Sequence, residues 1–161
     1  MKIFLKLLGC VAGCEAVGAV GAIFTTPAIG TWYAELVKPA INPPNWIFAP
    51  VWTTLFALMG VALFLIWKRA GEMPEEKGTA KTAIAVFAAQ LVLNVLWSVI
   101  FFGLHNPGAA FVEIVILWLF IVATIAVFAK VSRAAAWFLA PYIVWVSFAA
   151  YLNFAIWRLN G

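Results

Sequence analysis

The residues of this chain that could carry out chemistry are few, and apolar sequence surrounds them. The 161 residues include no aspartate, three serines and one histidine, His105. This inventory leaves little material for a hydrolytic triad or a multi-histidine metal site, so we expect neither. Two carboxyl groups lie inside long apolar stretches. Glu15 lies near the middle of one, where a charge is costly and marks a candidate functional group, and Glu113 lies about one turn inside another, near the membrane interface, where the cost is lower. For Glu15 the alternative is a protonated, hydrogen-bonded side chain with no other role, and no Lys, Arg or His within these stretches completes a proton relay.

Large aromatic side chains and single amides recur at helical spacing in three segments. The three sets, each on one face of a helix, are Trp52, Phe56, Met59 and Leu63; Gln90, Asn94, Trp97 and Phe101; and Trp145, Ala149, Leu152 and Asn153. Rings to stack on, with a few polar groups to orient a ligand, are typical of a pocket for a flat, mostly apolar molecule. The alternative is ordinary packing, in which the amides bond neighbouring helices and the indoles fill gaps.

Five apolar stretches must position these faces. Hydrophobic residues make up 66% of the chain, charged residues 10%, and the mean hydropathy is +1.07. A soluble domain is nearer half apolar and a quarter charged, so a soluble enzyme and a disordered chain are both excluded. A membrane-spanning helix needs about 20 apolar residues. We therefore predict an all-α integral membrane protein, a single domain over 1–161 with five transmembrane helices at about 3–26, 48–68, 81–104, 108–130 and 134–157.

The first connection, at about 27–47, is predicted to be a long structured loop. It is rich in aromatic residues and prolines and contains only two charged residues, Glu35 and Lys38. A solvated linker would be polar and flexible, whereas this composition favours a stiff segment that packs onto one end of the bundle. The alternative is an interfacial aromatic belt. The residues assigned to the lid are Trp32, Lys38, Pro39, Pro43, Pro44 and Trp46.

The basic residues are distributed unequally between the two ends of the expected bundle. The net charge is +4, but the ten Lys and Arg residues sit in short gaps between apolar blocks, which indicates membrane topology and not nucleic-acid binding. Eight of them fall on the side of the N-terminus, and Lys38 and Arg158 fall on the other. The positive-inside rule then predicts a cytoplasmic N-terminus and an external first loop, in a bacterial or archaeal-type cell membrane.

Small residues repeat along the first helix. Gly9 and Gly13 form a small-xxx-small face, and this face serves either a dimer or contacts within one chain. Cys10 and Cys14 lie in the same apolar segment, and their spacing does not favour a disulfide. We interpret them as small packing residues.

Longer motifs resemble one family. The first connection contains the string Trp32-Tyr33-x-x-Leu36-x-Lys38-Pro39, followed by Pro43-Pro44-x-Trp46-x-Phe48-x-Pro50-x-Trp52. Further strings are Gln90-x-x-x-Asn94-x-x-Trp97 and Pro141-Tyr142-x-x-Trp145-x-x-x-Ala149-x-x-Leu152-Asn153. Together they resemble the translocator protein (TspO/MBR) family, also called tryptophan-rich sensory proteins and peripheral-type benzodiazepine receptors, along nearly the whole chain.

The resemblance implies five helices, commonly a homodimer, and a ligand cavity closed by the first loop. Porphyrins and haem, sterols, and benzodiazepine-like drugs are the ligands associated with the family. The residues at the positions of the family's pocket are Tyr33, Trp52, Phe56, Asn94, Trp97, Trp145, Ala149 and Leu152. The family's sterol-recognition segment has tyrosines before a basic residue, and the stretch from Leu152 to Arg158 departs from that pattern, which argues against sterol binding.

We therefore expect a membrane receptor for tetrapyrroles and similar flat hydrophobic ligands, in contact with membrane lipid. Protoporphyrin or haem enters this expectation as a ligand; no cofactor is obligatory, and no metal, catalytic or nucleic-acid site is expected. One alternative is light-dependent breakdown of bound porphyrin, in which Trp52 and Trp145 would take part. Another is downhill transport of porphyrin or sterol, since the sequence contains no energy-coupling site.

Overall fold

The computed structural model describes residues 2–161, with side chains at all of these positions except Lys2 and Glu76. All regular secondary structure in the described chain is helical, and the described residues contain no strand. Its elements are α1 (Lys2–Ile29), α2 (Trp32–Glu35), η1 (Asn45–Ile47), α3 (Phe48–Glu72), η2 (Pro74–Glu76), α4 (Lys77–Ser98), η3 (Val99–Gly103), α5 (Pro107–Val131), α6 (Arg133–Phe138) and α7 (Ala140–Asn160).

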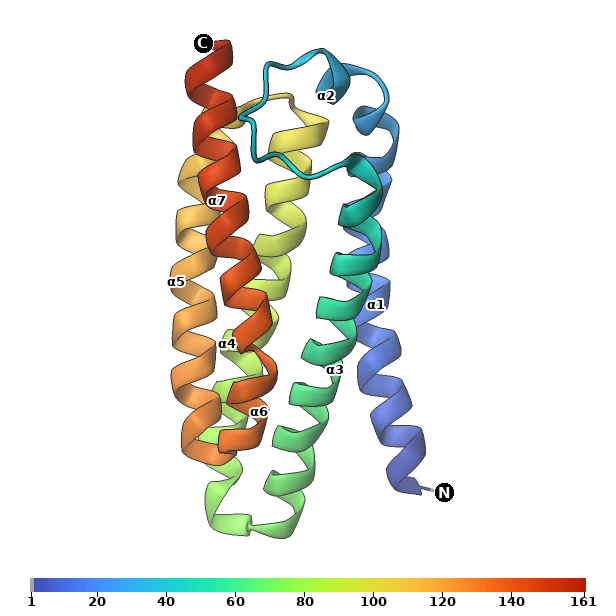
Figure 1. Ribbon diagram of the computed structural model, residues 1–161. Coiled ribbons are helices and arrows are strands. Elements are labelled where there is room, and N and C mark those ends of the chain that lie inside the picture. Colours follow the sequence, from blue (N-terminus) through green and yellow to red (C-terminus); the bar gives the residue numbers. More distant parts are fainter. Residues whose placement is uncertain (1) are drawn as a thin grey trace.

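Five stretches of the described chain are long and apolar enough to cross a membrane. They cover Ile3–Ile29, Asn45–Glu72, Lys77–Gly103, Pro107–Val131 and Arg133–Asn160. Figure 1 shows them side by side in an elongated bundle, with the N-terminus at one end and both α2 and the C-terminus at the other. The prediction of an all-helical membrane protein with five spanning segments is confirmed.

The first helix ends later than the sequence suggested. α1 continues to Ile29 and includes Pro27. Proline lacks the N–H that continues the helical ladder, and α1 ends two residues after it. The Thr31 hydroxyl donates to the Pro27 carbonyl over 2.9 Å and so satisfies one of the exposed carbonyls. A continuous long loop over 27–47 is therefore not confirmed, since α1, α2 and η1 all contribute helical residues to that range.

The fifth span is broken near its start. α6 ends at Phe138, and α7 begins at Ala140 with Pro141 in its first turn. Proline lacks the N–H that would continue the helical ladder, and its ring crowds the preceding turn. The Leu139 N–H bonds instead to the Ala136 carbonyl over 3.1 Å. The break lets α6 pack beside α3 while α7 continues to the opposite end of the bundle (Figure 1).

α4 ends in a π-helical turn, η3. Its closing bond runs from the Leu104 N–H to the Val99 carbonyl over 2.8 Å. π-helical turns are rare in proteins overall, and those that occur are often found at functional sites. Phe101 and Phe102 are both buried in this turn, with ring centroids 4.8 Å apart. His105 follows with a positive φ of 52°, and Pro107 opens α5.

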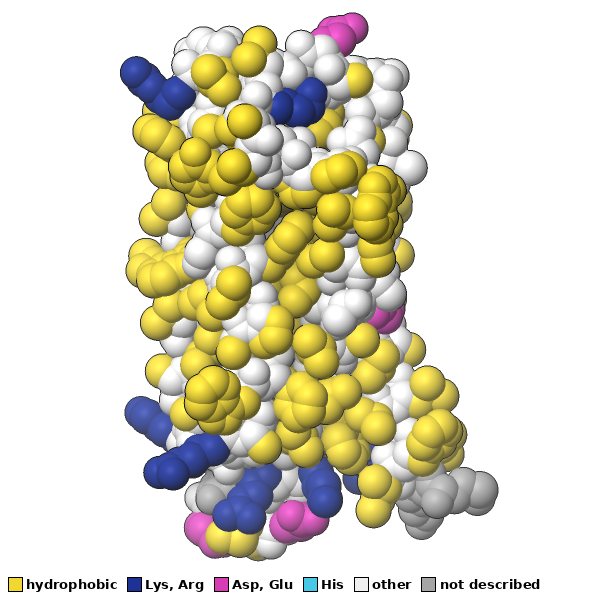
Figure 2. All heavy atoms as spheres, viewed as in Figure 1, with side chains coloured by type: hydrophobic (Ala, Val, Ile, Leu, Met, Phe, Trp, Pro, Cys, Tyr) yellow, Lys and Arg dark blue, Asp and Glu magenta, His cyan; other side chains and the backbone are white. Residues whose placement is uncertain are grey.

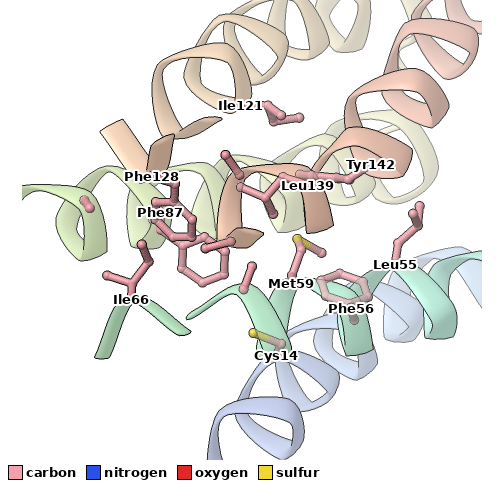
Figure 3. Close-up of a cluster of buried hydrophobic side chains, with 14 of the residues drawn as sticks. Cys14, Leu55, Phe56, Met59, Ile66, Phe87, Ile121, Phe128, Leu139 and Tyr142 are labelled. Atoms are coloured by element: carbon pink, nitrogen blue, oxygen red, sulfur yellow. The ribbon is translucent and has the colours of Figure 1, made fainter. Parts of the chain in front are cut away.

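The half of the bundle away from α2 contains the main hydrophobic core. Met59, Ile66, Ile121 and Phe128 are completely buried there, and the cluster draws side chains from α1, α3, α4, α5 and α7 (Figure 3). α1 and α3 approach so closely that a Cβ on Gly60 would lie 2.5 Å from the Cα of Val11, which explains the glycine.

A hydrogen-bond chain crosses the bundle at the upper edge of this core. The Tyr142 hydroxyl donates to the Gln90 Oε1 over 2.8 Å and accepts from the Asn94 Nδ2 over 3.0 Å. The Gln90 Nε2 lies 3.9 Å from the Met59 Sδ. Gln90 and Met59 thus belong to the packed core, so for these two residues the packing alternative holds and not the pocket.

Basic side chains gather at the end of the bundle that carries the N-terminus. Figure 2 shows most of the Lys and Arg side chains at that end and few at the end formed by α2 and the C-terminus of α7. The second group consists of Lys38 and Arg158. The positive charge is therefore segregated along the bundle axis, as the sequence count predicted.

Candidate functional site

The half of the bundle beneath α2 contains a partly open cavity of about 350 Å³. Its walls come from α1, α3, α4, η3 and α7, and α2 and η1 lie at its outer end. The structure brings all eight sequence-predicted ligand residues to this one cavity: Tyr33, Trp52, Phe56, Asn94, Trp97, Trp145, Ala149 and Leu152. Their participation in binding stays a prediction.

Aromatic rings form much of the wall. On α3, Trp52 and Phe56 are one helical turn apart, with ring centroids separated by 5.8 Å. On the opposite side Trp97 stacks on Phe101 at 5.3 Å, with an interplanar angle of 25°. Flat faces on two sides of one space suit a ligand that is itself flat and aromatic.

Gly18 on α1 makes room for one of these rings. A Cβ at this position would lie 2.5 Å from the Phe56 Cδ2. The absence of a side chain therefore allows the Phe56 ring to lie directly against the α1 backbone. The spacing of small residues on the first helix points to Gly9 and Gly13, and it does not connect Gly18 with the cavity.

Several polar groups of the wall have partners within the protein. Trp97 donates from Nε1 to the Asn153 Oδ1 over 2.9 Å, and the Asn153 Nδ2 donates to the Pro107 carbonyl over 2.7 Å. Asn94 is held by Tyr142, as described above. Within the described part of the chain, the buried Nε1 of Trp145 has no hydrogen-bond acceptor. A ligand carrying an acceptor could satisfy this donor.

Tyr33 anchors the cover of the cavity. It is only 3% exposed, its ring packs against Phe101 and Phe102, and its hydroxyl donates to the Asn42 Oδ1 over 2.9 Å. Burial raises the pKa of the Tyr33 hydroxyl, against a smaller lowering by the bond to Asn42. The neighbouring Trp32 stacks on His105 at 4.4 Å. α2 is thus docked on the end of α4.

The other residues assigned to the lid differ in how far they are buried and in what they contact. The Lys38 Nζ donates to the carbonyls of Ala34 and Leu36 and lies 4.8 Å from the Tyr33 ring centroid. Lys38 therefore fastens the segment that follows α2 and does not line the cavity. Pro39 and Pro43 are partly buried, and Pro44 is exposed. Trp46 is 72% exposed, so its ring does not dock onto the bundle.

A clamp from the C-terminal helix also holds this segment. The Asn160 Oδ1 accepts from the Val37 N–H, and the Asn160 Nδ2 donates to the Val37 carbonyl, both over 2.9 Å. This pair imitates one rung of a β-ladder. Val37 and Asn160 are more than a hundred residues apart in the chain, and no local sequence pattern predicts this contact.

The two intramembrane carboxyl groups have different surroundings. Glu15 lines the cavity and is partly exposed. Glu113 is 5% exposed, and neither of its carboxyl oxygens has a hydrogen-bond partner in the described part of the chain. The sequence placed Glu113 near the membrane interface, where burial would cost little, whereas α5 buries it inside the bundle. An ionised carboxylate without partners is costly there, which favours the neutral acid.

This fold and this site define a class: an integral membrane protein of five spanning segments with a covered, aromatic cavity. The chain belongs to the TspO/MBR family, whose family model matches residues 10–158. It is 47% identical to the tryptophan-rich protein TspO of Chlorobaculum tepidum, over 99% of this chain and 98% of that one. It is 41% identical to the TspO of Archaeoglobus fulgidus, over 98% of each chain. It is 37% identical to the human translocator protein, over 95% of this chain and 84% of that one.

Proposed function

We propose that this protein is a membrane receptor that binds flat hydrophobic ligands, tetrapyrroles foremost, in the cavity beneath α2. The observation that carries the proposal is the set of aromatic side chains around one cavity of about 350 Å³. This volume lies within the range of about 300–1,000 Å³ that is usual for small-molecule sites. Membership of the TspO/MBR family supports the same class of ligand.

The ring system of the ligand would lie between the indole and phenyl faces. Stacking of this kind contributes about 0.5–1.5 kcal/mol per aromatic pair beyond the burial of area. The Nε1 of Trp145 would donate to a polar atom of the ligand. His105 stacks on Trp32 and does not line the cavity, so haem would be held by its ring and not by an axial histidine.

The carboxylates of a tetrapyrrole would remain at the outer end of the cavity. No Lys, Arg or His belongs to the described lining, and the Lys38 ammonium is bonded to two backbone carbonyls. Leaving the propionates in water avoids the cost of burying unpaired charges. The segment from α2 to η1 would act as a lid that closes over the apolar part of the ligand.

A titration with protoporphyrin, followed by quenching of tryptophan fluorescence in detergent, tests the proposal. We expect saturable quenching by the wild-type protein. Ala149→Phe fills part of the cavity and should weaken binding by about tenfold or more, which corresponds to about 1.4 kcal/mol. Ala88→Phe, at an exposed position of α4, is the matched control and should bind normally. Quenching that never saturates, or equal affinity in a folded Ala149→Phe variant, would contradict the proposal.

Light-dependent breakdown of the bound porphyrin is a second candidate function. It is favoured by the presence of Trp52 and Trp145 in the cavity wall, where both rings would contact a photoexcited ligand. Illumination of the complex should then give a new bilin-like absorbing product that Trp52→Phe and Trp145→Phe variants do not form. Bleaching that proceeds equally in all three proteins would count against this function.

A further inference from the structure

The carboxyl group of Glu15, which is partly exposed, makes the end of the cavity away from α2 acidic. It lies near the middle of the first membrane span, Ile3–Ile29. The face of α1 that lines the cavity includes Glu15, Ala22 and Thr26, and α2 lies beyond the Thr26 end of this face. Glu15 is therefore the lining residue of α1 farthest from the cover. No hydrogen bond or ion pair within the described chain involves its carboxyl group.

The remaining wall is complementary to a cation. Trp52, Phe56, Trp97 and Trp145 present aromatic rings to the cavity, and no Lys, Arg or His lines it among the described residues. Aromatic faces attract ammonium groups, and the attraction grows when water is excluded. A carboxylate together with several rings, and without a competing positive charge, is the arrangement by which proteins recognise organic ammonium ions.

We propose that Glu15 and the neighbouring rings form a subsite for the ammonium group of an apolar amine. The inference rests on the proposed function in that both place the ligand in the same cavity. The ligand class is a flat or compact aromatic body that carries one primary, secondary or tertiary amine. The ammonium enters first and pairs with the Glu15 carboxylate, and the aromatic body fills the space between Trp52 and Trp97.

Pairing with an ammonium group offsets the free-energy cost of an isolated carboxylate at the centre of a membrane. An unpaired carboxylate is expensive in this environment, and so is an unpaired ammonium. Brought together within a membrane span, the two charges attract more strongly than in water, because the apolar surroundings screen them less. A neutral ligand of the same shape gains the stacking but lacks this attraction. The cavity should therefore select the amine from a matched pair of ligands.

Two pyrene derivatives provide such a pair. 1-Pyrenemethylamine carries an ammonium group at neutral pH, and 1-pyrenemethanol has the same four-ring body with a neutral hydroxyl. Binding of each is followed by energy transfer from tryptophan to pyrene in the detergent-solubilised protein. We expect the wild-type protein to prefer the amine by about tenfold or more. Glu15→Gln should abolish the preference, and Glu15→Asp should retain part of it because the charge remains.

Glu35→Gln is the matched control. It removes one negative charge at an exposed position on α2, near the outer end of the cavity, and should leave the preference unchanged. Glu15→Leu, which suits a membrane helix, replaces Glu15→Gln if the latter does not fold. Equal wild-type affinity for the two probes, or a preference that survives removal of the Glu15 carboxyl group, overturns the subsite.

The titration with protoporphyrin separates this proposal from the one on which it rests. If protoporphyrin saturates the protein and neither pyrene probe binds, the ammonium subsite is wrong and the tetrapyrrole site stands. If neither protoporphyrin nor the probes bind, both proposals are overturned.

Discussion

At the scale of single residues, the hydroxyl of Tyr33 makes docking of the cover sensitive to alkali. Its pKa is raised by burial, so the folded state favours the protonated form. The contribution of this group to stability is complete below the ordinary tyrosine pKa of about 10 and is lost as the pH rises beyond it. We expect the melting temperature of the wild-type protein in detergent to fall as the pH rises above about 10. Tyr33→Phe should be slightly less stable at neutral pH, having lost the bond to Asn42, and should show a smaller alkaline fall. Identical pH profiles would contradict this role.

Gly18 provides a second prediction at this scale. In Gly18→Val the new side chain would collide with the Phe56 ring, which must move into the cavity. Overpacking of this kind costs about 1–3 kcal/mol, and the smaller cavity should bind protoporphyrin more weakly. Gly13→Val is the matched control on the same helix, because nothing lies within 4 Å of a Cβ at that position. Fluorescence titration and thermal unfolding of the two variants check the prediction, and equal effects would contradict it.

At the scale of elements, the contacts of α2 predict how the cover affects ligand kinetics. Trp32→Ala removes the stacking on His105 and the edge contact with Phe101, which should shift the cover toward its open state. Burial of one aromatic side chain contributes about 1.5–3 kcal/mol, so release of a fluorescent porphyrin should accelerate by about ten- to a hundredfold. The association rate should change less, because the open mouth still admits ligand. Trp46→Ala is the control, since this indole is already 72% exposed. Stopped-flow release at the same rate in all three proteins would show that α2 is not a lid.

The elements also show which features the sequence can predict. Five apolar stretches of spanning length indicate five helices by hydropathy alone, and the helical spacing of Trp52 and Phe56 places both rings on one face. The π turn at the end of α4 and the clamp between Asn160 and Val37 depend on tertiary contacts with no local pattern. For the same reason the sequence could not distinguish Gln90, which faces Tyr142 in the core, from Asn94, which reaches the cavity one turn later.

At the scale of the whole molecule, the charge distribution predicts the orientation in the membrane. The end that carries most of the basic residues should face the cytoplasm, and α2 should face the outside. Cys10 and Cys14 are buried, so single cysteines introduced elsewhere report on topology. In intact cells, a membrane-impermeant maleimide should label Glu35→Cys on α2 and should label Glu75→Cys only after lysis. The reverse pattern would invert the topology.

The central claim is that a tetrapyrrole lies inside the cavity and not on the lipid-facing surface. Brief illumination of the protoporphyrin complex, followed by mass spectrometry of oxidised tryptophans, tests it most directly. Trp52, Trp97 and Trp145 line the cavity, whereas Trp46 and Trp137 are 72% and 76% exposed outside it. The account predicts oxidation concentrated on the three cavity residues, and suppression of that oxidation in Ala149→Phe. Oxidation concentrated on Trp46 and Trp137, with no change in Ala149→Phe, would contradict it.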